Sequence, residues 1–566
     1  MARIDLPREK KVKHLTLLRE PRRLSGKEFN ALAFAERLEM VRSAHGRDKY
    51  NLLIEARDAE ELVRRLPAQD MYLLFKEMGA EDVPELLPLV TREQFTAFLD
   101  LDCWQKDLLD ADKALYWLTL LLDAGEEPVL RMATGIDFGL LVLTVKKFVT
   151  ITAAPGDTLD EDVAAERRLE GVYDVDYRDA ESAKIVGAFL DLIFRRERDF
   201  YLHLMEAVRW EPEAMLEEEV YGARRDRLLD LGFPDPFEAL GVYAWLDPET
   251  FDPAQQRKLS LRPAEAEIEA PAFALAAARP KDLLADILAT GIDHETSWEL
   301  TYLINKVMSA ERIDVGESRQ VREATEEAYR YLNLALEHLS GSDPGKASAL
   351  FDNCYLEHLF RLGFSLTLQL QRQAKKLASG RIGPYLDGPM RAFLDALGQR
   401  RPRFYAGIEA AERAGERPFA TVHDLTLAAN WLERLAGQRR LFEERLPFEL
   451  PAPAELDLSG CAPDDPTDLT LSDFFLTALA NRILGRPFVP RPLPQKELPA
   501  LHARICRGGE LDPELRLETG RWLDSLEPGA TAFADWCLDL WQQELCTVRA
   551  EDLDPRFVSG VIVRLA

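Results

Sequence analysis

The sequence lacks the short motifs by which most enzyme families are identified. It contains no GxxxxGK[ST] phosphate loop, no GxGxxG after a strand, no HExxH and no GxSxG. Its eight histidines include no pair at i,i+4 spacing. These absences argue against the common nucleotide-binding, zinc-peptidase and serine-hydrolase classes, while a site built from carboxylates far apart in sequence stays open. We therefore predict no cofactor and no metal site.

Cysteine is scarce and scattered. The six cysteines form no CxxC pair, and the two closest, Cys537 and Cys546, are nine residues apart. That spacing places them on opposite faces of a helix, where they are poor joint metal ligands. The pattern predicts reduced, mostly buried thiols in a cytosolic protein and no disulfide framework.

Long apolar runs are absent as well. The most apolar stretch, FGLLVLTVKKFVTI, is interrupted by Lys146 and Lys147 and is too short to cross a bilayer. The N-terminus carries no apolar secretory core. We expect a cytoplasmic protein that is not an integral membrane protein.

Basic residues are in deficit except at the N-terminus. The 566-residue chain has 99 acidic and 71 basic residues, a net charge of −28. A surface this acidic repels phosphate backbones, so we expect no nucleic-acid partner. Residues 1–27 differ, because nine basic and three acidic residues give them a net charge of about +6. This basic arm is either a solvated tail that folds back onto the acidic body, which we favour, or an arm for nucleic acid or a membrane surface.

The clearest pattern present is an internal repeat from Ala59 to Leu101. Apolar pairs recur every twelve residues, followed by breakers or caps at Pro67, Gly79 and Thr91. Helices this short are marginal alone, so the repeat predicts stacked short helices in a solenoid. The alternative is an ordinary helical bundle with accidental spacing. The pairs are Leu62-Val63, Leu74-Phe75, Leu86-Leu87 and Phe98-Leu99.

Two details of the repeat predict local structure. Thr91 stands three residues before Gln94, the spacing of a capping box. Pro88 lies inside PELLPLV, so the helix there should be kinked or very short.

Two resemblances follow from longer segments. EELVRRLPAQDMYLLFKEMGAEDVPELLPLVTREQF resembles the helical repeats in the cytoplasmic N-terminal domain of MgtE-type magnesium transporters and in the flagellar motor-switch protein FliG. RLLDLGFPDPFEALGVYAWLDP, ELTYLINKVMSAE and FFLTALANRILGRPF resemble an uncharacterised bacterial family of similar length, a domain of unknown function. The second resemblance implies one architecture and a bacterial cytosolic protein, and it implies no activity.

The predicted fold class is mainly α, with a short-helix superhelical repeat near the N-terminus, a second helical region and a small β-hairpin insertion. We expect a long helix from Glu317 to about Leu339, and the tail VSGVIVRL forms either a strand or a terminal helix. The predicted parts are a basic arm (1–27), a repeat domain (28–133), a helical region with the β insertion (134–245), a linker (246–280), a helical domain (281–445), and a Pro-rich wrap with C-terminal helices (446–566).

One charged cluster is the candidate site. Glu217 and Glu218 lie one turn before Tyr221, and Arg224 and Arg225 lie one turn after it. Side chains three and four residues apart on a helix are neighbours. The functional interpretation is a clamp in which the arginines bind an anion or a carboxylate. The structural interpretation, which we favour, is a ladder of ion pairs.

Two functions from different classes follow. We favour a non-enzymatic cytosolic scaffold or regulatory module that binds protein partners, as yet unknown, through its helical repeats, because solenoids expose extended surfaces. The alternative is an enzyme of unknown class with acidic residues and Arg224 or Arg225 in a cleft between the two halves of the chain.

Overall fold

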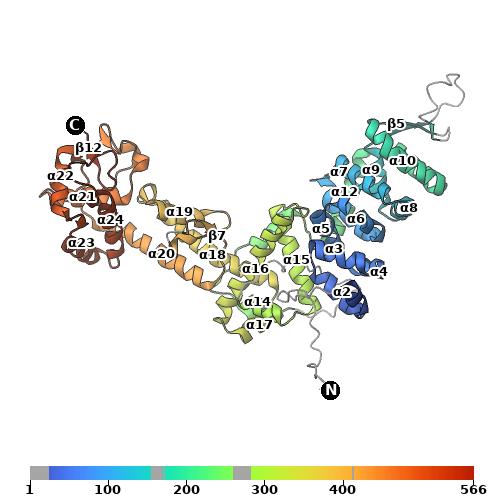
Figure 1. Cartoon of the computed structure of the whole chain (residues 1–566), viewed down its shortest axis with the longest axis horizontal. Helices are drawn as coiled ribbons and strands as arrows, with labels where there is room; N and C mark the ends of the chain where they lie inside the picture. The colour runs from blue at the N-terminus through green and yellow to red at the C-terminus, as the bar shows by residue number, and fades with distance from the viewer. Residues whose placement is uncertain (1–24, 154–167, 170–172, 259–281, 411–412, 566) are drawn as a thin grey trace, which may run out of the picture. The chain divides into compact units, whose positions relative to one another are not determined.

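The computed structural model describes residues 25–153, 168–169, 173–258, 282–410 and 413–565 (Figure 1). The fold is mainly α with small sheets, as predicted. Two compact units divide the chain, residues 1–362 and 363–566, and their boundary falls inside helix α18 (Leu356–Ala378). The predicted linker at 246–280 lies within the first unit, largely outside the described residues, and the other predicted boundaries stay predictions.

The first unit is built mainly from helices. Its helix α16 matches the predicted long helix to within one residue at each end. The helices are α1 (Gly26–Ala31), α2 (Phe34–Ser43), α3 (Gly46–Glu55), α4 (Ala59–Arg65), α5 (Ala68–Met78), α6 (Arg92–Asp102), α7 (Ala111–Asp123), α8 (Glu126–Ala133), α9 (Phe138–Lys146), α10 (Ala180–Arg196), α11 (Arg198–Trp210), α12 (Glu213–Asp230), α13 (Pro236–Ala239), α14 (Leu283–Ala289), α15 (His294–Glu311), α16 (Ser318–Ser340) and α17 (Pro344–Asn353).

The side chains of the apolar pairs are buried throughout the predicted repeat. All eight paired side chains are less than a tenth exposed. The capping box is present, since Thr91 accepts from the backbone N–H of Gln94 and donates its own N–H to the Gln94 side chain. Pro88 lies in a 3₁₀ helix, η2 (Pro84–Leu89), which confirms the very short helix. The stacking of these helices as a solenoid, and with it the likeness to MgtE and FliG, stays a prediction.

The predicted β insertion is present and has three strands. Strand β5 (Tyr173–Tyr177) pairs antiparallel with β3 (Val149–Ala153) on one side and β4 (Arg168–Leu169) on the other. Its buried Tyr173 and Val175 alternate with less buried Asp174 and Asp176, which is the pattern of a half-buried strand. A smaller hairpin joins β1 (Trp104–Gln105) to β2 (Leu108–Leu109).

The second unit contains the rest of α18 and six further helices among its described residues. Two short hairpins, β6 (Phe404–Tyr405) with β7 (Glu416–Arg417) and β10 (Cys506–Arg507) with β11 (Glu510–Leu511), lie between them. The helices are α19 (Gly388–Gly398), α20 (Val422–Arg440), α21 (Leu471–Ile483), α22 (Leu498–Ile505), α23 (Pro513–Leu526) and α24 (Thr531–Trp541).

The C-terminal tail forms a strand, which decides between the two predicted alternatives. Strand β12 (Val563–Arg564) lies between β8 (Cys461–Ala462), to which it is antiparallel, and β9 (Leu493–Pro494), to which it is parallel. Just before it, the backbone N–H groups of Gly560 and Ile562 donate to buried acceptors on α21. The tail is therefore part of the core of the second unit.

The prediction for the cysteines was wrong for one pair. Cys506 and Cys546 form a disulfide across 40 residues of sequence, while the other four cysteines are buried free thiols. Spacing along the sequence could not reveal this pair, because β10 brings Cys506 beside the end of the π-helical segment Gln542–Cys546 only through the fold.

The helices were compared with the length and apolar character that crossing a bilayer requires. Within the described ranges no single helix is long and apolar enough to cross a bilayer, and α8 with α9, bent by 113° at the break between them, meets the criteria of length and composition only as a pair.

Candidate functional site

The predicted charged cluster lies on α12, where its five residues have different surroundings. The Nε of Arg224 donates to the backbone oxygen of Asp100 at 2.8 Å, and its guanidinium lies 5.1 Å from the ring centre of Trp104. The Tyr221 ring lies 6.1 Å from the same indole. Burial lowers the pKa of Arg224, opposed by Asp100. The structure therefore brings Tyr221 and Arg224 together against Trp104.

The glutamates and the second arginine of the cluster lie elsewhere on the helix. Glu217 accepts from Nζ of Lys147 at 2.5 Å, in a pair that Glu213 shares at 2.6 Å. Glu218 and Arg225 are exposed. The five residues therefore do not form one site. Tyr221 and Arg224 pack against Trp104, Glu217 pairs with Lys147, and the other two side chains are exposed.

Sequence reasoning missed Arg227, which makes a bidentate ion pair from α12. Its guanidinium donates two hydrogen bonds to the Asp100 carboxylate, at 2.7 and 2.9 Å, and one to Asp137 at 3.3 Å. Asp100 is 1% exposed, and burial raises its pKa against the opposing effect of Arg227. Because Asp100 is 127 residues away, no local spacing pointed to this pair.

A second polar centre of the first unit surrounds Asp102. Its carboxylate accepts from Nε1 of Trp117 at 2.9 Å and from the ammonium groups of Lys76 and Lys113 at 3.0 and 3.2 Å. Burial alone would raise the pKa of Asp102, but the bond from Trp117 and the two lysines outweigh it and lower the pKa. Burial also raises the pKa of the adjacent Tyr72 hydroxyl well above its ordinary value. Each charged group here is paired, which is typical of a structural centre.

The first unit also has an apolar surface that we call the corner patch, formed by Leu229, Phe237, Leu240 and Tyr302. These side chains are 54, 74, 38 and 41% exposed. Leu229 lies at the end of α12, Phe237 lies in α13, and Leu240 begins the 3₁₀ helix η3 (Leu240–Tyr243) that follows it. Tyr302, on α15, donates from its hydroxyl to the backbone oxygen of Asp230 at 2.9 Å.

The backbone of the corner is fixed. Gly232 has φ +84°, and a Cβ there would lie 3.0 Å from Cα of Tyr302, so only glycine fits. The guanidinium of Arg312 lies 5.6 Å from the ring centre of Phe237.

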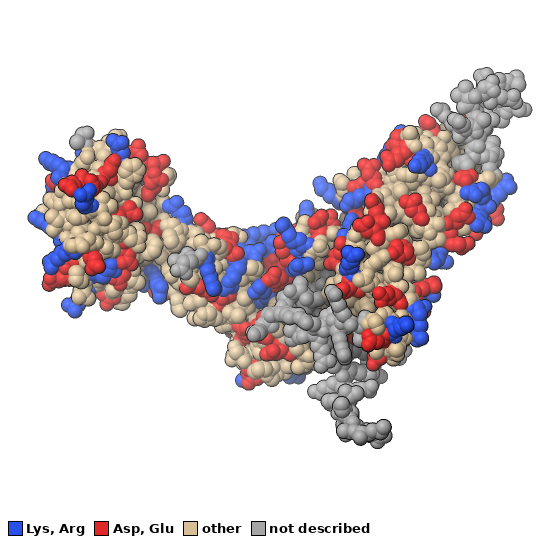
Figure 2. Space-filling view, viewed as in Figure 1, with Lys and Arg blue, Asp and Glu red and all other residues tan. Residues whose placement is uncertain are grey.

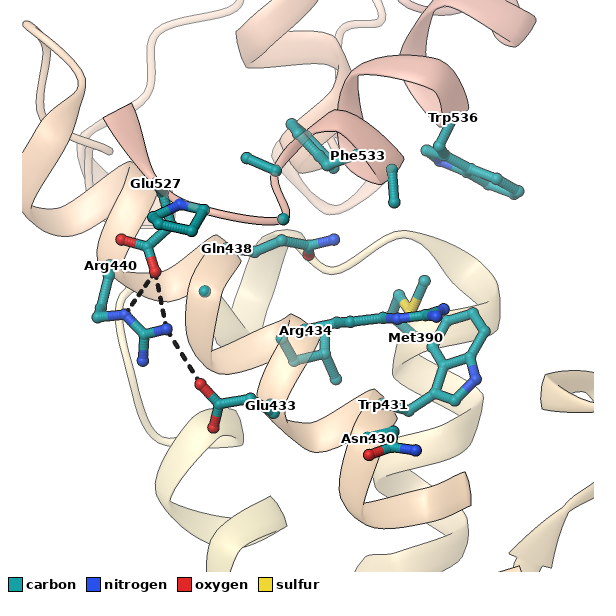
Figure 3. A pocket seen from close by; sticks show the side chains of 16 residues that line it. Met390, Asn430, Trp431, Glu433, Arg434, Gln438, Arg440, Glu527, Phe533 and Trp536 are labelled. Atoms are coloured by element: carbon teal, nitrogen blue, oxygen red, sulfur yellow. Dashed lines mark hydrogen bonds and ion pairs between the residues drawn. The ribbon is translucent and has the colours of Figure 1, made fainter. Parts of the chain in front are cut away.

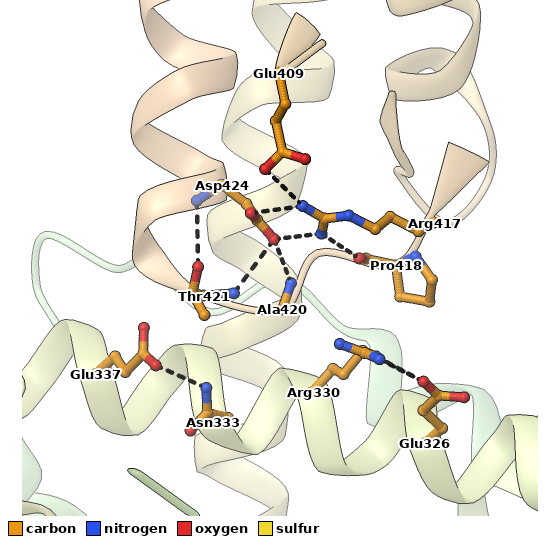
Figure 4. Close-up of polar contacts among 10 residues, drawn as sticks. All are labelled: Glu326, Arg330, Asn333, Glu337, Glu409, Arg417, Pro418, Ala420, Thr421 and Asp424. Atoms are coloured by element: carbon orange, nitrogen blue, oxygen red, sulfur yellow. Dashed lines mark hydrogen bonds and ion pairs between the residues drawn. The ribbon is translucent and has the colours of Figure 1, made fainter. Parts of the chain in front are cut away.

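In the second unit, Arg417 fixes the start of α20 (Figure 4). Its guanidinium donates to both oxygens of the Asp424 carboxylate at 2.7 and 2.9 Å and to Glu409 at 3.2 Å. Asp424 also accepts from the backbone N–H of Ala420 at 2.7 Å, closing the first turn. Burial would raise the pKa of Asp424, but Arg417 and the backbone donors lower it. This bidentate pair holds the helix that forms one wall of the pocket described next.

A pocket of about 490 Å³ lies between α20, α24, the first turn of α19 and the turn Glu527–Ala530 (Figure 3). Arg440 bridges two acids at its edge: its guanidinium donates to Glu527 at 2.7 Å and to Glu433 at 3.1 Å. Aromatic side chains from both helices form the walls, and polar side chains of α20 face into it. The lining includes Met390, Asn430, Trp431, Arg434, Gln438, Phe533 and Trp536.

Sequence reasoning did not single out this pocket. Phe533 and Trp536 lie on α24, within the region 446–566 for which C-terminal helices were predicted. Asn430, Arg434 and Gln438 follow one another at i,i+4 spacing, a polar stripe that could have been noticed. Nothing in the sequence shows that the two stretches, about a hundred residues apart, share one cavity.

Metal ligands do not gather in the described part of the chain, where no group of three or more His, Cys, Asp or Glu side chains could hold an ion. Figure 2 shows acidic and basic side chains interspersed over the face drawn.

Comparison with known proteins gives one match. A family described as "Family of unknown function (DUF6178)" matches residues 26–564. No curated protein and no solved structure matches the chain.

Proposed function

Because the chain belongs to the DUF6178 family of unknown function, we propose its function from its own surface: a non-enzymatic module that binds a protein partner through its first unit. The observation that carries the proposal is the corner patch. Three large apolar side chains within twelve residues of sequence are exposed there, and Phe237 has 74% of its surface in solvent. Apolar side chains gathered on a surface are typical of interaction sites.

The surroundings of the patch support a binding role. The apolar pairs of the predicted repeat are buried, so they stabilise a frame and leave no apolar anchor of their own for a partner. At the corner the backbone is held by Gly232 and by the hydrogen bond from Tyr302 to Asp230. A preorganised surface loses little conformational freedom when it binds.

The charge around the patch indicates the chemistry of the partner. Asp226, Asp230 and Glu238 are exposed in the same stretch as Arg225, and Arg312 lies over Phe237. The chain as a whole carries −28. Charge complementarity favours a partner of opposite sign. We therefore propose a partner segment with a large apolar anchor flanked by lysine or arginine.

The enzyme alternative depended on Arg224 or Arg225 facing a substrate. Arg224 instead bonds a backbone oxygen and stacks on Trp104, which supports a structural role for it. The exposed Arg225 has no such environment.

A matched pair of variants tests the proposal. Leu229→Ser with Phe237→Ser removes the centre of the patch, while Phe557→Ser removes a 79% exposed phenylalanine from the second unit as a control. Native complexes are purified with each protein under gentle conditions. A partner that co-purifies with the wild type and the Phe557 variant, and is lost with the patch variant, supports the proposal. Equal recovery with all three proteins, or no partner and a bound metabolite, refutes it.

A further inference from the structure

The pocket of the second unit has preset aromatic walls. Phe533 is 4% exposed and makes edge contacts with the rings of Phe442 and Phe475, whose centres lie 5.5 and 5.6 Å away. Trp536, one turn along α24, is 39% exposed and hydrogen-bonds the buried Asp387. Trp431 enters from α20 (Figure 3). These flat surfaces suit a planar ring, because aromatic rings favour offset stacks and edge contacts.

The ion network at the edge of the pocket is already complete. Nε and Nη2 of Arg440 donate to Oε1 of Glu527 at 2.8 and 2.7 Å, and Nη2 also donates to Glu433. Glu527 is 6% exposed. Arg440 is therefore fully engaged by these two carboxylates, and the three side chains lie at one end of the cavity.

Arg434 is the charged group left for a ligand. Its guanidinium lies 5.2 Å from the ring centre of Trp431, and no carboxylate among the described residues lies within ion-pair distance of it. Figure 3 shows the side chain extended along the cavity above Trp431. A stacked guanidinium keeps its planar fork of donors free, which favours a bidentate carboxylate.

Gln438 supplies a second, different recognition element. Its Oε1 is buried and has no hydrogen-bond partner within the described ranges. A buried acceptor without a donor is costly, so a ligand that brings an N–H group gains the missing bond. Gln438 follows Arg434 by four residues on α20, about 6 Å along the helix axis. Both residues line the same pocket.

We propose that this pocket binds a small planar heteroaromatic acid: its carboxylate pairs with Arg434, its ring N–H donates to Oε1 of Gln438, and its ring lies against Trp431 and Trp536. The cavity of about 490 Å³ accommodates a bicyclic ring with a short acidic arm. This site is separate from the corner patch and does not depend on the proposed partner binding.

The test uses the full-length protein and three probes that differ by one feature each. Indole-3-acetate has the bicyclic ring, the N–H and the carboxylate; naphthalene-1-acetate lacks the N–H; indole-3-ethanol lacks the charge. Calorimetric titration should show saturable one-to-one binding of indole-3-acetate and affinities at least about tenfold lower for the other two.

Variants place the binding in this pocket. Arg434→Gln should weaken indole-3-acetate about tenfold or more and leave indole-3-ethanol unchanged. Gln438→Leu should weaken indole-3-acetate and leave naphthalene-1-acetate unchanged. Arg521→Gln, an exposed arginine of α23 outside the pocket, is the control and should bind like the wild type.

Four outcomes overturn the proposal: no binding of indole-3-acetate up to about 1 mM, binding that survives both pocket substitutions, equal affinity for the two acids, or equal affinity for the charged and neutral indoles. Unchanged circular dichroism of the variants excludes unfolding as the cause of any loss.

Discussion

Replacing Asp102 is the sharpest test of how the first unit is held together. The carboxylate is 3% exposed and joins three partners on two helices: Lys76 of α5, and Lys113 and Trp117 of α7. Asp102→Ala removes the acceptor of all three and leaves Nε1 of the fully buried Trp117 without a partner. Asp102→Asn keeps an acceptor for that indole and removes only the charge.

The magnitudes follow from the burial of each partner. An unsatisfied buried N–H costs about 1–3 kcal/mol. Lys76 and Lys113 are 28 and 41% exposed, so solvent screening limits each ion pair to about 0.5–1 kcal/mol. We therefore expect Asp102→Ala to destabilise the unit by about 3 kcal/mol, and Asp102→Asn by about 1–2 kcal/mol.

The pH dependence has a definite sign. The pKa of Asp102 is lower in the folded protein than its ordinary value, so its ionic contribution is present above about pH 4 and is lost as the pH falls through the folded pKa. Urea unfolding followed by circular dichroism should show the gap between wild type and Asp102→Asn at pH 7 and a smaller gap at pH 3. Asp107→Asn, at an exposed position of the β1–β2 turn, should match the wild type. A variant as stable as the wild type at pH 7, or a gap independent of pH, would refute this reasoning.

Three further predictions concern the N-terminal part of the chain. Leu74→Asp or Leu86→Asp should each destabilise the repeat by several kcal/mol, because both side chains are buried and the new charge would be unpaired; unchanged melting temperatures would contradict this. Thr91→Ala should cost about 1 kcal/mol in urea unfolding through loss of the bond to Gln94, and equal stability would count against the capping box. Neither the full-length protein nor one lacking residues 1–27 should shift DNA in a gel at 150 mM salt. In the full-length protein, the arm should become more sensitive to protease as the salt concentration rises. A DNA shift seen only with the full-length protein would make nucleic acid a partner.

Local patterns in the sequence predicted local structure well. The i,i+3 spacing of Thr91 and Gln94 predicted the capping box, and Pro88 inside PELLPLV predicted the very short helix η2. Both depend on residues within a few positions of one another, where backbone geometry alone determines which side chains meet. The same reasoning located the long helix α16.

Partners distant in sequence could not be predicted in this way. Arg224 was expected to interact within its own helix, but its neighbours are Asp100 and Trp104. The disulfide of Cys506 depends on a similar long-range approach. The pocket joins Arg434 to Trp536 across about a hundred residues, and aromatic residues at helical spacing in the sequence look the same whether they face a core or a cavity.

The small sheet of the second unit has a consequence for the order in which that unit is assembled. Its middle strand, β12, is synthesised after both of its neighbours, and β8 and β9 do not pair with each other. Until β12 arrives, the backbone donors that reach Asp473 and Thr477 on α21 are missing too. Contacts so distant in sequence form slowly, because the intervening chain must first lose its freedom. During synthesis, then, a ribosome-bound chain that already carries every helix of the second unit still lacks the strand that closes it.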